Sequence, residues 1–143
     1  MTENFPYEEM TASDYAIRHG LDNTPSDTSK VRLLETAKQM EVVRSLLGNN
    51  SIHVNSAYRS PTLNRAIGGS PTSAHCLGYA VDFTCHGFGT PYEIVKHLKS
   101  SGLKYDQLIY EGTWVHISFD PRYRQQTLTA IFNKGKTTYK PFQ

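Results

Sequence analysis

Two histidines and one aspartate in the middle of the chain have the residue types of a metal site. His75 and Asp82 lie in the stretch Ser73–Asp82, and His116 follows within Trp114–Ser118. Two imidazoles and one carboxylate leave one position of a four-coordinate zinc ion open, which is typical of catalytic zinc sites. The pattern therefore predicts one Zn²⁺ ion bound by His75, Asp82 and His116.

Each of these residues also has an ordinary structural interpretation. His75 could cap a turn, Asp82 could end a strand, and His116 could be a packed core imidazole. The zinc prediction depends on the three occurring together and in this order. His86 follows the metal strand and could line the cleft. The remaining histidines are interpreted as surface or structural residues: His19, His53 and His97.

The order of these residues resembles a known family of zinc enzymes. The pattern SxHxxGxAxD begins at Ser73, WVHIS follows it, and Tyr58-Arg59-Ser60 stands upstream. Together they resemble the M15 zinc peptidases, the D-Ala-D-Ala carboxypeptidase family of peptidoglycan enzymes. The same zinc-binding core is found in Hedgehog signalling domains. The resemblance extends from about Leu21 to Ser118, and its Asn23–Ser26 lead-in is similar to that of phage-type members.

The resemblance implies zinc-assisted hydrolysis of an amide bond in a peptidoglycan stem peptide, by a D-Ala-D-Ala carboxypeptidase or a murein endopeptidase. It implies that Arg59 contacts the substrate near the scissile carbonyl, and that Ser73 binds substrate or orders its loop. Tyr58 and Trp114 are candidates for walls of the cleft, although either could belong to the core. The alternative function is a catalytically silent zinc module that binds cell wall or protein.

The general base departs from the family pattern. Many M15 members carry the acid three residues before the last zinc histidine, where this chain has Thr113. Glu111 is our candidate, because a hairpin turning at Gly112-Thr113 places it on the same face as His116, one diagonal step away. Asp106 is the rival, but it begins the strand and has the opposite parity.

The hydrophobic pattern predicts the elements that would position these residues. A helix from about Thr28 to Leu47 has apolar residues at three- and four-residue spacing, and the residues before about Asp27 look irregular. His75 is expected on the loop that enters a strand at 78–83. Further strands are expected at 51–57, 105–111 and 114–119, with a last hairpin at 127–132 and 136–139. Shorter helices are expected to begin at Ser60-Pro61 and at Thr90.

These elements predict an α+β fold with a central, mostly antiparallel sheet and helices packed on it. We expect one domain over residues 1–143 with its core at about 21–119, of the Hedgehog and DD-peptidase type that the resemblance implies. Cys76 and Cys85 are the only cysteines, which argues against a disulfide scaffold and favours two small buried thiols.

Composition limits the function classes. The chain has 143 residues, 38% of them hydrophobic and 20% charged, and a net charge of +2. That charge is too small to indicate nucleic-acid binding, and no stretch is long enough to span a membrane. The N-terminus lacks the pattern of a signal peptide. We therefore expect a monomer made in the cytoplasm that reaches the cell wall after release, as a phage endolysin, or on a virion.

Overall fold

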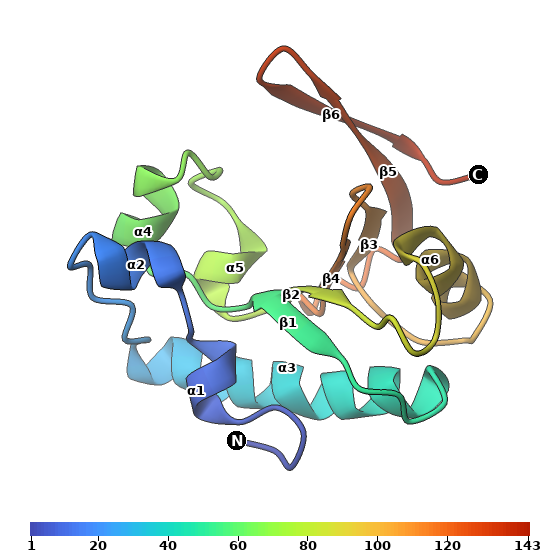
Figure 1. Ribbon diagram of the computed structural model, residues 1–143, viewed down its shortest axis with the longest axis horizontal. Coiled ribbons are helices and arrows are strands. Elements are labelled where there is room, and N and C mark those ends of the chain that lie inside the picture. The colour runs from blue at the N-terminus through green and yellow to red at the C-terminus, as the bar shows by residue number, and fades with distance from the viewer.

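The computed structural model describes residues 1–143 and combines a six-stranded sheet with six helices (Figure 1). The strand order is β1-β2-β4-β3-β5-β6, and every neighbouring pair is antiparallel except β3 and β5. This architecture confirms the predicted α+β class with a mostly antiparallel sheet. No helix has the length and apolar character needed to cross a membrane.

The strands are β1 (His53–Ser56), β2 (Ala80–Thr84), β3 (Gln107–Tyr110), β4 (Val115–Ser118), β5 (Gln126–Asn133) and β6 (Lys136–Pro141). The helices are α1 (Tyr7–Met10), α2 (Asp14–Arg18), α3 (Asp27–Leu46), α4 (Pro61–Ala66), α5 (Ala74–Leu77) and α6 (Pro91–Lys99). The hairpins at the C-terminus and around Gly112-Thr113 lie where the sequence predicts them.

The long helix α3 lies beneath the strands in Figure 1 and supplies one side of the core. The Ser26 hydroxyl begins it by accepting a hydrogen bond from the Ser29 backbone N–H. Its buried stripe includes Leu33, Ala37 and Met40, which share one hydrophobic cluster with strand residues and with helix α6. The predicted helix is therefore confirmed, and its apolar face is the core contact.

The N-terminal region is helical where the sequence predicts irregular chain. Helices α1 and α2 are too short to show a hydrophobic period, and helices of this length depend on tertiary packing. Met10 is fully buried, and its carbonyl accepts a hydrogen bond from the Tyr58 backbone N–H. The Asn23 side chain also donates to the Tyr58 carbonyl and accepts from the Ser60 N–H. The N-terminal region, residues 1–26, thus holds the Tyr58-Arg59-Ser60 segment in place.

His75 lies on the short helix α5, whereas the sequence predicts a loop at this position. The Ser73 hydroxyl caps the helix, and Gly78 ends it in the left-handed conformation at φ +87°. A Cβ atom on Gly78 would lie 2.7 Å from the Ser29 carbonyl oxygen of α3. Thr36 of α3 donates a 2.6 Å hydrogen bond to the Gly78 carbonyl. The glycine therefore allows the His75 helix to lie directly against α3.

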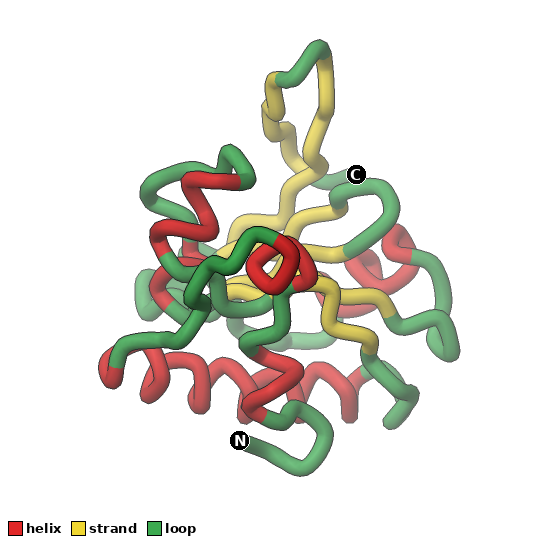
Figure 2. The backbone as a smooth tube through the Cα atoms, turned by 60° about the vertical axis from the view of Figure 1, so that its left-hand side comes forward, coloured by secondary structure: helices red, strands yellow, loops and turns green.

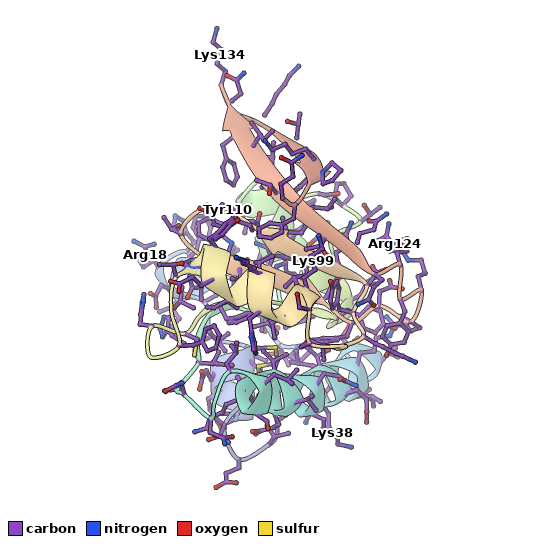
Figure 3. All side chains as sticks on the ribbon, turned by 90° about the vertical axis from the view of Figure 1, so that its right-hand side faces the viewer. Arg18, Lys38, Lys99, Tyr110, Arg124 and Lys134 are labelled. Carbon is purple, nitrogen blue, oxygen red and sulfur yellow. The ribbon has the colours of Figure 1, made fainter.

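The last two strands form a long hairpin that projects away from the rest of the molecule (Figures 1 and 2). Its base is tied into the sheet because β5 pairs in parallel with β3. Lys134 lies at its tip, as Figure 3 shows, and Tyr110 lies near its base. We call this hairpin, β5 and β6, the arm.

Candidate metal centre

His75 is almost fully buried, and one ring nitrogen has a fixed partner. Its Nδ1 lies 2.6 Å from the Ala57 carbonyl oxygen at the end of β1. A carbonyl oxygen can only accept, so Nδ1 carries the proton and Nε2 keeps its lone pair in the neutral ring. That Nε2 lies 3.3 Å from Oδ1 of Asp82. The backbone carbonyl thus aims one ligand atom at the carboxylate, as partners outside the metal shell commonly do.

Asp82 and His116 come from neighbouring strands. They are direct partners in the antiparallel pairing of β2 with β4, so their side chains share one face of the sheet. Nδ1 of His116 lies 2.9 Å from Oδ1 of Asp82. One ligand atom from each of His75, Asp82 and His116 lies within 4.8 Å of the other two. The structure therefore brings together all three residues that the sequence predicts as zinc ligands.

The electrostatics of this cluster fit a cation. Burial lowers the pKa of His75 and so favours the neutral ring, whose Nε2 lone pair then faces a carboxylate oxygen. Burial opposes the charge of Asp82, but the two histidines outweigh it and hold the pKa of Asp82 well below its usual range. Two imidazole nitrogens and a carboxylate oxygen are a donor set that zinc prefers. A divalent cation would satisfy the lone pairs that converge here.

Glu111 lies beside this cluster at the end of β3. The register of β3 with β4 pairs Ile109 with His116, as the predicted turn requires. Oε2 of Glu111 lies 4.0 Å from Nδ1 of His116 and accepts a 3.1 Å hydrogen bond from Nε1 of Trp114. Burial, with a further contribution from the negative charge of Asp82, raises the pKa of Glu111. The structure thus places a partly shielded carboxylate, held by Trp114, next to the candidate metal ligands.

Asp106, the rival base, has a structural role. It is buried, and both of its carboxylate oxygens accept 2.8 Å hydrogen bonds from the Arg124 guanidinium. The Arg124 backbone N–H also donates to it, and these bonds hold its pKa below the usual range. A carboxylate occupied in this way by an arginine is a poor proton acceptor. The pairing leaves Glu111 as the candidate base.

A family model described as Peptidase M15 matches residues 3–118. The chain belongs to the M15 peptidase family. It is also 30% identical over 79 residues to the zinc D-Ala-D-Ala carboxypeptidase of Streptomyces albus G, a match that covers 55% of this chain and 30% of that relative. The chain therefore spans less than a third of that relative's length. These matches confirm the resemblance to M15 zinc peptidases and with it zinc as the metal.

Arg59 of this M15 peptidase lies beside α5, the helix that carries His75. One nitrogen of its guanidinium, Nη2, lies 3.4 Å from Oγ of Ser73. The backbone N–H of Arg59 donates a hydrogen bond to the His75 carbonyl. The Nε atom of Arg59 is buried and has no hydrogen-bond partner. A buried donor without a partner is uncommon, and a catalytic role is one explanation for such a group. Ser73 orders the helix start through its bond to the His75 N–H.

The four predicted substrate contacts differ in their placement. Tyr58 is only 4% exposed and belongs to the hydrophobic core, so its alternative interpretation as a core residue holds. Trp114 lines a hollow of about 390 Å³ beside Glu111. The hollow is also lined by two residues of the arm, Ala130 and Phe132, whose position no sequence pattern predicts. His86, which the sequence offered as a residue that could line the cleft, is exposed. Both cysteines are free thiols; Cys85 is buried and Cys76 is half-buried.

Proposed function

We propose that this M15 peptidase hydrolyses an amide bond in peptidoglycan stem peptides, with zinc held by His75, Asp82 and His116 and with Glu111 as general base. The observation that carries the proposal is the Glu111 carboxylate, fixed 4.0 Å from a metal-ligand nitrogen. The relative from Streptomyces albus G, named as a D-Ala-D-Ala carboxypeptidase, supports this substrate class.

Zinc bound by such a ligand set acidifies water and polarises a carbonyl oxygen. The protein's own contribution begins with orientation. The Ala57 carbonyl fixes the tautomer of His75, and the pairing of β2 with β4 fixes Asp82 against His116. Because a backbone carbonyl holds His75 and strand pairing positions Asp82 and His116, the three side chains need little rearrangement when the metal binds.

Glu111 would accept a proton from the attacking water and deliver it to the leaving nitrogen. The raised pKa of Glu111 moves this carboxyl closer to neutral pH, where a base both exists as carboxylate and can pass its proton on. The hydrogen bond from Trp114 keeps one oxygen in place, and the second oxygen is available to the water. A base held in this way contributes roughly 10²- to 10⁴-fold to the rate.

Arg59 would stabilise negative charge on the substrate. Its guanidinium carries donors that fit a carbonyl oxygen or a carboxylate, and its unpaired Nε lies in the same region as Ser73 and His75. The charge of Arg59 also contributes to the pKa values of His75, His116 and Glu111, which places it within electrostatic reach of the centre.

Mass spectrometry of muropeptides tests the proposal and identifies the bond. Zinc-loaded protein should release new peptide fragments from purified peptidoglycan: terminal D-Ala from a carboxypeptidase, or internal fragments from an endopeptidase. His75→Ala and His116→Ala should lose both the metal and the fragments. If the wild-type protein retains stoichiometric zinc but releases no fragment, the catalytically silent zinc module is the better interpretation.

A further inference from the structure

The arm lies beyond the part of the chain that matches the peptidase family. The match ends at residue 118, whereas β5 and β6 occupy Gln126–Asn133 and Lys136–Pro141. None of the candidate catalytic residues discussed above lies on the arm. It nevertheless leaves the sheet beside β3, the strand that leads to Glu111 (Figure 1).

The arm and the β3–β4 hairpin form two sides of the open hollow next to Glu111. Tyr110 and Trp114 line it from the hairpin, whereas Ala130 and Phe132 line it from the arm. Its volume of about 390 Å³ falls within the range of small-ligand pockets, roughly 300–1,000 Å³. We call this hollow the arm groove. It is continuous with the centre, because Glu111 lines the groove and also lies beside His116.

The register of the arm determines which side chains face the groove. Ala130 pairs with Tyr139 across the two strands, so the Tyr139 ring lies on the same face as Ala130 and Phe132. Phe132 is 56% exposed and Tyr139 is 53% exposed, although both are large aromatic residues. Burial, followed by the negative charges of Glu111 and Asp82, raises the pKa of Tyr139. The groove-facing side of the arm therefore lies within electrostatic reach of the metal centre.

We propose that the arm groove binds the peptide chain that extends from the scissile bond, with Phe132 and Trp114 contacting its side chains from opposite walls. This inference depends on the proposed peptidase function for the identity of the ligand. A chain positioned for attack near Glu111 must leave the centre in some direction, and the groove begins at that residue. Its walls are mostly apolar, and aromatic walls of this kind bury the small aliphatic side chains of a stem peptide favourably.

The test compares two substrates on the zinc-loaded protein: the full stem peptide, and one trimmed to the two residues that flank the cleaved bond. Phe132→Ala should lower kcat/KM for the full peptide on the order of tenfold, mainly through KM, because it removes one aromatic wall. It should leave the trimmed peptide nearly unaffected. Since Phe132 is half-exposed, its truncation should not unfold the protein.

Ile131→Ala is the matched control. Ile131 neighbours Phe132 on β5, is 40% exposed, and by strand alternation faces the opposite side of the arm. It should leave both substrates unchanged. The proposal is overturned if Phe132→Ala has no effect, if it affects both substrates equally, or if Ile131→Ala has the same effect. A dimer in sedimentation that Phe132→Ala abolishes would instead assign Phe132 to contact between two copies.

A binding experiment separates this inference from the proposed function. Trp114 is the only tryptophan in the chain and lines the groove, so its emission reports on the groove directly. If the wild-type protein cuts neither peptide, the proposed function fails, and the stem peptide is titrated against Trp114 emission. A saturable change that Phe132→Ala weakens and Ile131→Ala does not would support the groove. No saturable change would overturn it.

Discussion

Replacing Glu111 with glutamine should abolish most of the activity without disturbing the metal centre. Glutamine has nearly the size of glutamate, and its amide oxygen can still accept the hydrogen bond from Nε1 of Trp114, which Oε2 of Glu111 accepts at 3.1 Å. What it loses is the ability to take a proton. The three candidate metal ligands are unchanged, and Oε2 of Glu111 lies 4.0 Å from Nδ1 of His116.

The expected loss is about 10²- to 10⁴-fold in kcat, the usual contribution of a general base, or about 3–5 kcal/mol of transition-state stabilisation. Stability should not fall, because the change removes a partly buried negative charge next to Asp82, which itself raises the pKa of Glu111. KM should change little if the carboxylate acts on water and not on the bound peptide.

Three measurements on one preparation decide the matter: steady-state hydrolysis of the stem peptide, zinc content by atomic spectroscopy, and thermal unfolding. Glu111→Gln with full zinc, a wild-type melting temperature and near-normal turnover would refute the role of Glu111 as base. Loss of zinc in this variant would instead make Glu111 a supporting residue of the metal site. Glu111→Asp is a useful companion, because it keeps the carboxylate but shortens its reach towards the water.

Three other substitutions test separate parts of the structure. Gly78→Ala should destabilise the fold by more than about 2 kcal/mol in urea titration, because of its positive φ and the Ser29 carbonyl 2.7 Å from the new Cβ; wild-type stability would show that α5 can move. Asp106→Asn should cost about 2 kcal/mol at pH 7 by weakening the Arg124 pair. The pKa of Asp106 is lowered in the folded state, so this stability is present above pH 4 and disappears as pH falls through the folded pKa; a constant difference from pH 7 to pH 2 would contradict that. Arg59→Ala should keep zinc and fold but reduce turnover, and unchanged kinetics would assign Arg59 a structural role instead.

The clustering of Asp82 and His116, two of the candidate metal ligands, could be predicted from sequence because local rules fix their strands. Asp82 and His116 sit on short strands whose alternation is visible in the sequence, and the turn at Gly112-Thr113 sets the register that places Glu111 beside His116. The sequence predicts a loop at His75, since the four residues of α5 contain no helical period. Its helix exists because Gly78 permits close contact with α3, a tertiary cause that no local pattern reports.

The parts that could not be predicted depend on contacts between distant segments. Tyr58 is buried because the N-terminal region lies against it. The backbone of Tyr58 forms hydrogen bonds with the Met10 carbonyl and with the Asn23 side chain. The two strands of the last hairpin are evident from alternation and from the turn residues. The parallel pairing of β5 with β3 is not evident, and it is this pairing that brings Phe132 towards Glu111.

This chain has Thr113 where many M15 members carry the catalytic acid, and the geometry of the β3–β4 turn accounts for the difference. Thr113 is exposed in a tight turn, where its backbone N–H donates to the Glu111 carbonyl, so it lies beyond the last pair of the ladder. Glu111 pairs with Trp114 through the Trp114 carbonyl, and alternation places it on the face of His116. A carboxylate at Glu111 can therefore reach the metal ligands from the strand end, where the neighbouring Trp114 also holds it. In this chain the position of the candidate base is set by the sheet register and not by its distance along the sequence from the last histidine.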